Sequence, residues 1–286
     1  MDIRYRHATI QGHRIFYREA GPADAPTVVL LHGFPSSSHM YRNLIPALAD
    51  RYHVVAPDYL GYGHSDAPSV RDFAYTFESI TAVTAELLDH LGLDRFTLYV
   101  QDFGAPVGFR IASRNPEKVI AIITQNGNAY NEGLNPGLRA VLNGANARNH
   151  LTLRDNITLA FTKGMYLNGV PDPTLVSPDT WLIDQTLLDR PGADEIALAL
   201  LADYPTNLTL YPDFQKYLRD TQVPLLAVWG GNDEIFIADG ARAFATDLPD
   251  AEIHLLDTGH FALETHLNTI AGYIRGFLGR VLTSTK

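Results

Sequence analysis

The sequence predicts an α/β fold in which a mainly parallel, doubly wound sheet is interrupted by an inserted group of helices. Three observations support this fold class. Apolar runs such as residues 28–31 (Val-Val-Leu-Leu) lack polar alternation, which is typical of strands covered on both faces. These runs alternate with amphipathic helical patterns, as in right-handed strand-helix-strand units. The alternation stops near residue 125 and resumes near residue 223, so we expect an insertion between these points.

The first part of the chain, residues 1–125, is expected to form one half of the sheet. Residues 8–20 indicate two short strands joined at Gly12. A helical pattern over residues 76–91 keeps its apolar side chains on one face and ends at Gly92, a residue type that commonly terminates helices. Further strands are expected at residues 28–31, 53–58, 97–100 and 119–124, with a helix carrying Met40, Leu44 and Leu48 on one face and another helix after residue 102.

Residues 126–215 are rich in Asn, Gly and Pro and show helical stretches but no strand of comparable strength. We interpret this segment as a helical cap over the sheet. Its helices are expected at residues 151–166, 178–188 and 195–202. The α/β alternation returns in residues 216–286, with strands at 223–229 and 251–256, a helix at 238–245 and a final amphipathic helix over 267–281. The catalytic core would then consist of residues 1–125 and 216–286, with the cap between them.

Length, charge and composition exclude several classes of protein. The 286 residues are 46% hydrophobic, which is enough for a substantial core and excludes a disordered or fibrous chain. A net charge of -10 disfavours binding to nucleic acid or to an anionic membrane. There is no cysteine, and therefore no disulfide, thiolate metal site or thiol nucleophile. The sequence has no apolar signal core and no apolar run that could span a bilayer, so we expect a cytoplasmic protein.

The stretch 98–105 (Leu-Tyr-Val-Gln-Asp-Phe-Gly-Ala) joins a β-prone apolar run to a helical pattern through an acid and a glycine. Strand, sharp turn and helix are the context of a nucleophile elbow, which holds a reactive side chain on a strained backbone at the top of a sheet. Asp102 would be the nucleophile. Asp is also a favourable helix N-cap, so an ordinary capping role remains the alternative for this residue.

Two further loops carry polar residues at the carboxyl ends of predicted strands. Asp233 follows one strand and His260 follows another, and the carboxyl ends of neighbouring parallel strands meet at one edge of a sheet. The chain order is therefore nucleophile, acid, histidine. In such a triad the acid orients the imidazole, and the imidazole acts as the base.

On these residues the chain resembles an alpha/beta-hydrolase of the epoxide hydrolase and haloalkane dehalogenase branch. The matching segments are His32-Gly33-Phe34-Pro35, residues 61–66 (Gly-Tyr-Gly-His-Ser-Asp), residues 100–104, residues 230–233 and Gly259-His260. The resemblance implies that Asp102 is the nucleophile, Asp233 the acid and His260 the base. It also fits Val100, because this branch tolerates a residue larger than Gly two positions before the nucleophile.

The resemblance and the chemistry of a carboxylate together predict a two-step hydrolysis. A carboxylate is already ionised at neutral pH and can displace a leaving group from a saturated carbon, which forms an alkyl-enzyme ester. His260 would then deprotonate a water that attacks the carbonyl carbon of Asp102. The resulting oxyanion needs donors, and the backbone N–H groups of Phe34 and Phe103 are the candidates.

The leaving group separates two substrate classes. In dehalogenases of this branch, Trp typically follows the nucleophile and a donor often follows His-Gly, but here these positions hold Phe103 and Phe34. Trp181 in the cap is the indole that could reach the pocket. An epoxide needs a proton at its ring oxygen, which suits tyrosines, and Tyr166 and Tyr204 are the best cap candidates. The alternative for each tyrosine is plain packing. We therefore expect epoxide opening, with a haloalkane or haloacid dehalogenase as the alternative.

Metal and cofactor sites receive no support from the sequence. It contains no His-Glu-x-x-His spacing and no Gly-x-Gly-x-x-Gly after a strand, so we expect no metal and no cofactor. The expected partners are a small uncharged organic substrate and water, with neither nucleic acid nor membrane, and the chain is expected to be a monomer or homodimer. A non-hydrolytic ligand-binding role on the same fold is the third hypothesis, because fold does not fix function.

Overall fold

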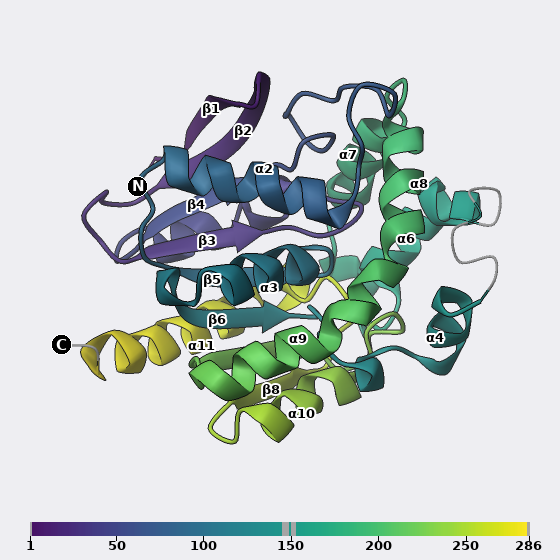
Figure 1. Ribbon diagram of the computed structural model, residues 1–286. Coiled ribbons are helices and arrows are strands. Elements are labelled where there is room, and N and C mark those ends of the chain that lie inside the picture. Colours follow the sequence, from purple (N-terminus) through teal and green to yellow (C-terminus); the bar gives the residue numbers. More distant parts are fainter. Residues whose placement is uncertain (1, 145–148, 150–152, 285–286) are drawn as a thin grey trace.

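The computed structural model describes residues 2–144, 149 and 153–284. Within these residues one eight-stranded sheet crosses the molecule (Figure 1). In sheet order its strands are β1 (Arg4–Ile10), β2 (His13–Ala20), β4 (His53–Pro57), β3 (Thr27–Leu31), β5 (Phe96–Gln101), β6 (Val119–Gln125), β7 (Leu225–Gly230) and β8 (Glu252–Leu256). The strands from β4 to β8 in this order run parallel, whereas β1 and β2 form an antiparallel edge. The predicted α/β class with a mainly parallel sheet is confirmed.

Burial explains which strands lie in the centre of the sheet. Every residue of β3, β4, β5 and β7 is buried, as expected for apolar runs covered on both faces. The edge strand β1 is mostly exposed and pairs with β2 through a tight turn, in which Gln11 and Gly12 have φ angles of 51° and 82°. Two residues in the left-handed region are typical of a two-residue hairpin turn.

Helices cover both faces of the sheet (Figure 1). The longer helices are α1 (Leu44–Leu48), α2 (Phe77–His90), α3 (Gly104–Arg114), α4 (Pro136–Leu142), α6 (Leu159–Leu167), α7 (Pro178–Leu188), α8 (Ala193–Asp203), α9 (Pro205–Thr221), α10 (Ala238–Asp247) and α11 (Leu263–Ser284). Short 3₁₀ helices are η1 (Ser38–Tyr41), η2 (Pro116–Lys118), η3 (Asn131–Gly133), η4 (Arg154–Ile157) and η5 (Pro173–Leu175). One face carries the row α2, α3, α9 and α10, and α11 covers the other face together with α1.

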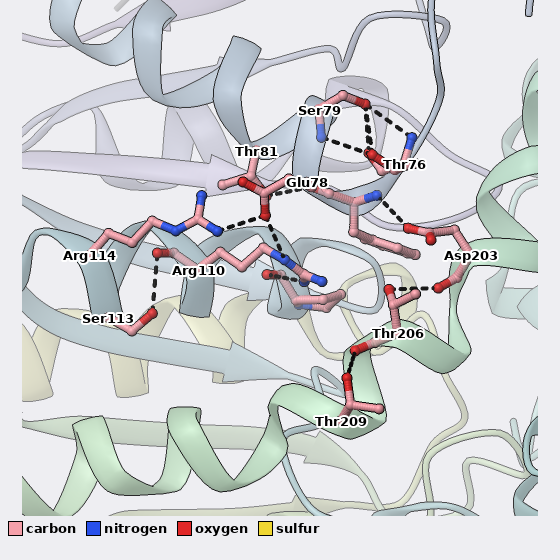
Figure 2. Close-up of polar contacts among 12 residues, drawn as sticks. Thr76, Glu78, Ser79, Thr81, Arg110, Ser113, Arg114, Asp203, Thr206 and Thr209 are labelled. Carbon is pink, nitrogen blue, oxygen red and sulfur yellow. Dashed lines mark hydrogen bonds and ion pairs between the residues drawn. The ribbon is translucent and has the colours of Figure 1, made fainter.

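Helix α2 shows how local sequence sets an element's ends. The Thr76 side chain caps its first turn by accepting a hydrogen bond from the Ser79 N–H, and the Ser79 side chain accepts one from the Thr76 N–H. The helix ends just before Gly92, whose φ is 69°. Figure 2 shows this cap beside Asp203, which also accepts a bond from the start of α2. The helix predicted over residues 76–91 is confirmed.

The helices α4, α6, α7 and α8 lie at the carboxyl ends of the strands, beyond the arrowheads in Figure 1. Predicted helix 178–188 coincides with α7, and 195–202 lies within α8. The start of the predicted helix 151–166, at Leu151, lies outside the described residues. The described part is split into η4 and α6, because Thr158 is extended and caps α6 by accepting from the Phe161 N–H.

Helix α9 was not predicted from the sequence. It contains Pro212 and several weak helix formers, so its local propensity is poor. Its buried side chains, Tyr211, Phe214 and Leu218 among them, supply the packing that local propensity lacks. The expected boundary between residues 215 and 216 falls inside this helix, which packs on α3 and α10 and thus covers the sheet. No helix in the described ranges is long and apolar enough to cross a membrane.

Candidate active site

The three candidate catalytic residues lie at one edge of the sheet. Asp102 follows β5, Asp233 follows β7 and His260 follows β8. His260 Nδ1 lies 2.7 Å from Asp233 Oδ2, and His260 Nε2 lies 3.7 Å from Asp102 Oδ2. All three side chains are buried. The structure therefore brings together the three residues that the sequence analysis placed in one triad.

The backbone of Asp102 has the strained geometry of an elbow. Its φ is 49°, a left-handed conformation that non-glycine residues rarely adopt. Helix α3 begins two residues later at Gly104, where a Cβ would lie 2.1 Å from the Leu31 carbonyl oxygen. Only glycine allows this close approach between the turn and β3. The N-cap residue of α3 is Phe103, so the alternative role of Asp102 as the N-cap receives no support.

The loop after β3 supplies a donor to Asp102. The Phe34 N–H donates to Asp102 Oδ1 at 2.7 Å, and the Phe103 N–H also hydrogen-bonds to this carboxylate. Gly33 permits the contact, because a Cβ at this position would lie 2.3 Å from the Cβ of Asp102. Two backbone donors thus converge on one carboxylate, which is the geometry expected of an oxyanion hole.

The pKa values of Asp102 and His260 are both raised, for different reasons. Burial raises the pKa of Asp102 above its ordinary value, and the nearby His260 opposes this rise. Burial alone would lower the pKa of His260. The negative charges of Asp233 and Asp102 outweigh that effect, so the pKa of His260 is raised above 6.5.

Two residues in contact with the triad were missed by the sequence analysis. Asn126, which follows β6, donates to Asp233 Oδ2 at 2.8 Å and accepts from the Gly230 N–H at 2.9 Å. The Nε2 of Gln101 lies 2.8 Å from the Nε2 of His260. The sequence feature that could have indicated Asn126 is the polar run at residues 125–128 (Gln-Asn-Gly-Asn), which follows a buried strand.

Comparison with known proteins places this geometry in a family. Residues 26–267 match the model of the alpha/beta hydrolase fold. The chain belongs to the alpha/beta hydrolase family. A protein of Saccharomyces cerevisiae described as an uncharacterized hydrolase is 41% identical over 276 residues, which cover 94% of each chain. A haloalkane dehalogenase of Mycolicibacterium paratuberculosis is 41% identical over 116 residues, which cover 40% of this chain and 38% of that protein.

Solved structures share the fold over almost the whole chain. Haloalkane dehalogenase DbeA from Bradyrhizobium elkani superposes with a TM-score of 0.83 at 24% identity, covering 99% of this chain and 100% of that one. An epoxide hydrolase mutant from Vigna radiata superposes with a TM-score of 0.75 at 21% identity, covering 98% and 99%. The predicted membership of the alpha/beta-hydrolase superfamily is confirmed, and the protein is a hydrolase enzyme. Haloalkane dehalogenases are among its partial relatives.

A cavity of about 260 Å³ opens beside the alpha/beta-hydrolase elbow. It is lined by Phe34, Asp102, Phe103, Asn135, Leu138, Val141, Leu142, Leu153, Asn156, Phe161, Met165, Leu201, Tyr204, Ile235 and Phe236. Most of these side chains are apolar, and none of these described residues is Arg or Lys. A second cavity, of about 410 Å³, reaches His260 and Asp233 and shares Phe161, Met165 and Ile235 with the first. The hydrolase site is thus apolar around Asp102 and more polar around His260.

Of the three cap residues expected to contact substrate, only Tyr204 lines the cavity with Asp102. Tyr166 is buried at the contact between cap and core, where its hydroxyl donates to Asp184 Oδ2 at 2.5 Å and its ring stacks on Phe261 with 3.9 Å between centroids. Trp181 lies beside Tyr166, with ring centroids 6.4 Å apart. The expectation for these two side chains is corrected, because a buried carboxylate and a stacking partner hold Tyr166 away from the pocket. Among the described residues, no group of His, Asp or Glu is arranged to hold a metal ion.

Proposed function

We propose that the protein hydrolyses small uncharged epoxides to diols through a covalent ester on Asp102. The observation that carries this proposal is that Asp102 and Tyr204 line the same apolar cavity. The Phe34 N–H holds the Asp102 carboxylate in place. A carboxylate is the nucleophile that this chemistry needs, and a phenol is a suitable acid for a ring oxygen. The apolar lining suits an uncharged substrate.

The first step forms the ester. Asp102 Oδ1 accepts from the Phe34 N–H, which leaves Oδ2 to attack a ring carbon of the epoxide. The carbon–oxygen bond of the ring breaks, and the ring oxygen takes its proton from Tyr204. The backbone N–H donors of Phe34 and Phe103 hold the carbonyl oxygen of the new ester.

The second step hydrolyses the ester. A water takes the place of the Gln101 amide at His260 Nε2, loses a proton to the imidazole and attacks the carbonyl carbon of Asp102. Collapse of the oxyanion breaks the ester bond and expels an alkoxide, which takes the imidazolium proton and becomes the diol. Asp102 is left as a carboxylic acid, and its proton returns to the Tyr204 phenolate. His260 must be neutral to act as the base, so we expect hydrolysis to slow as the pH falls through its raised pKa.

Trapping the ester tests the proposed function. His260→Gln removes the base of the second step but leaves the nucleophile, so this variant should gain the full mass of styrene oxide in intact-protein mass spectrometry. The double variant Asp102→Asn/His260→Gln should gain no mass. Wild-type turnover of styrene oxide without any adduct on His260→Gln would contradict the covalent route, as would water oxygen that enters the diol directly in a single turnover in oxygen-18 water.

A dehalogenase activity is the second candidate, because haloalkane dehalogenases are among the relatives. A halide leaving group needs N–H donors, and Asn156 lines the cavity. The side chains of Phe34 and Phe103, which line it too, cannot donate. Measuring halide release from 1-bromobutane and styrene oxide turnover on the same preparation distinguishes dehalogenation from epoxide hydrolysis. Faster release of bromide than of diol would favour the dehalogenase.

A further inference from the structure

The cavity beside Asp102 is mostly apolar, and one of its polar side chains takes no part in the steps above. Among the described residues that line this cavity, the polar side chains are those of Asp102, Tyr204, Asn135 and Asn156. Asp102 and Tyr204 carry the proposed ring opening. The Asn135 amide is engaged elsewhere, because its Oδ1 accepts from the Leu138 N–H at 2.7 Å and its Nδ2 donates to the Glu234 carbonyl. Asn156 is therefore the polar side chain whose task is unassigned.

The Asn156 amide is available to a ligand. Asn156 is half-buried, and its side chain forms no hydrogen bond with another residue in the part of the chain that the structure describes. A primary amide offers two N–H donors and a carbonyl acceptor, so it can pair with a hydroxyl, ether or carbonyl oxygen of a bound molecule. Such a ligand would displace water from Asn156 without breaking a contact within the protein.

The end of the cavity at Asp102 is aromatic. The ring centroids of Phe34 and Phe103 lie 5.5 Å apart, and those of Phe103 and Tyr204 lie 5.8 Å apart. The Tyr204 ring in turn lies 6.3 Å from that of Phe236. Because the N–H groups of Phe34 and Phe103 bond to the Asp102 carboxylate, these rings belong to the reacting end of the cavity.

The other end of the cavity is aliphatic and comes from the cap. Its side chains are those of Leu138, Val141, Leu142, Leu153 and Leu201. Leu201 and Ile157 pack against a small apolar cluster of the cap that contains Leu153. Val141 is 54% exposed, so this end lies near the molecular surface. Asn156 stands between Leu153 and Ile157 in the chain and belongs to this outer end, away from the reacting bond.

We propose that Asn156 binds a hydrogen-bonding oxygen at the far end of the substrate chain. This inference rests on the proposed function and deepens it, because it names the substrate class: neutral aliphatic epoxides that carry a hydroxyl or carbonyl group away from the ring. The epoxide ring lies among the aromatic side chains at Asp102, and the chain lies along the aliphatic wall. The terminal oxygen then meets the Asn156 amide, which determines specificity and takes no part in bond breaking.

The polarity of the cavity explains this selectivity. A hydroxyl group that enters an apolar cavity loses its hydrogen bonds to water, which is unfavourable unless a protein group replaces them. Asn156 supplies the replacement at one place only, so the position of the oxygen along the chain matters. A carboxylate at that place is disfavoured, because the described lining contains the negative Asp102 and neither Arg nor Lys.

The test compares pairs of epoxides that differ only by a terminal hydroxyl in place of a methyl group. One pair is 5,6-epoxyhexan-1-ol and 1,2-epoxyheptane, and the same comparison is made with chains two carbons shorter and two carbons longer. The measured quantity is the ratio of kcat/KM for the hydroxylated member to that for its methyl partner. In wild type this ratio should be highest at one chain length. Asn156→Leu should lower that maximum roughly 3- to 10-fold, as expected for one hydrogen bond between neutral groups.

Controls separate recognition of the oxygen from a general effect on the cap. Asn143→Leu is the matched control and should leave the ratio unchanged, because Asn143 is a cap asparagine that does not line the cavity. If Asn156→Leu fails to fold, Asn156→Ala gives the same comparison. A ratio that the Asn156 variant leaves unchanged at every length, or equal losses for both members of each pair, would overturn the role of Asn156. A wild-type protein that hydrolyses none of these epoxides would instead overturn the proposed function.

Discussion

At the scale of single residues, side-chain contacts separate the two interpretations of Asp102. An N-cap side chain would accept from an N–H two or three residues further on, inside the helix. The Asp102 carboxylate instead accepts from the Phe34 N–H on a different loop and from the N–H of the adjacent Phe103. Its left-handed backbone adds strain that a simple cap would not need. Strain of this kind at a buried charge is typical of a functional position rather than of a turn.

Asn126 offers a test of how the acid is held. Its φ is 48°, and its side chain bonds both Asp233 and Gly230. Asn126→Gly removes these hydrogen bonds but tolerates the backbone, and it should lower the free energy of unfolding by about 2 kcal/mol. Asn126→Ala should lower it by roughly 1 kcal/mol more, because a Cβ disfavours the left-handed conformation. Urea denaturation of both variants measures the difference, and equal losses would show that backbone strain plays no part.

Sequence reasoning found the triad but not its supports. Asp102, Asp233 and His260 follow strand ends in the chain, and a parallel sheet brings such ends together. Asn126 and Gln101 are ordinary polar residues in sequence, and their contacts with Asp233 and His260 come from distant segments. Tyr166 is the opposite case, a residue that the sequence suggested for the pocket but that lies outside it. Its hydroxyl donates to the buried Asp184 carboxylate instead of facing the cavity.

At the scale of elements, one junction ties the cap to the sheet. Asp203, the last residue of α8, accepts from the Phe77 N–H at 2.8 Å and thus holds the start of α2 (Figure 2). Thr206 donates to the Asp203 carbonyl, and the buried Arg110 lies close by, with its guanidinium over the Phe77 ring. Tyr204 is the next residue in the chain. The position of the proposed acid therefore depends on a helix cap that is formed between elements far apart in sequence.

Replacing Asp203 should loosen this junction. Asp203→Ala removes the acceptor at the positive end of α2 and should lower the free energy of unfolding by about 1 kcal/mol. Asp203→Asn keeps an acceptor in place and should cost less than half as much. Chemical denaturation compares the two, and a loss in Asp203→Asn as large as that in Asp203→Ala would assign the effect to charge rather than to the hydrogen bond.

The same scale explains which elements the sequence could predict. Central strands have unmistakable apolar runs, and α2 carries its own caps, so both follow from local pattern. Helix α9 does not follow from local pattern, because Pro212 and polar residues interrupt its apolar positions. Its buried face is defined by packing against α3 and α10. Tertiary packing overrides local propensity in such segments.

At the scale of the whole molecule, cap and core meet around one buried carboxyl. Asp184 on α7 accepts from the Tyr166 hydroxyl, also in the cap, and from the Ser36 hydroxyl at 3.2 Å in the loop that carries Phe34. Burial raises the pKa of Asp184 to about 7. The negative Glu264 raises this pKa too, whereas Arg42 lowers it. The contact between the two parts of the enzyme thus contains a titrating group.

This carboxyl makes stability depend on pH in a definite direction. With a pKa of about 7 when folded and 3.8 as the ordinary value, Asp184 binds its proton more tightly in the folded state. Its contribution is complete below pH 4 and is lost as the pH rises to 7, and the full difference corresponds to roughly 4 kcal/mol. The neutral variant Asp184→Asn should therefore lack this part of the decline in stability between pH 4 and 7.

The measurement is the free energy of unfolding of wild type and Asp184→Asn at several pH values across that window. The difference between the two proteins isolates Asp184 from the other carboxyls, which titrate in both. Asp179→Asn is the matched control, because it removes an exposed aspartate from the same helix. A constant difference between wild type and Asp184→Asn from pH 4 to 7 would mean that Asp184 has the same proton affinity in the folded and unfolded chain. The hydroxyls of Ser36 and Tyr166 would then be sufficient to hold it charged, and the contact between cap and core would not respond to pH.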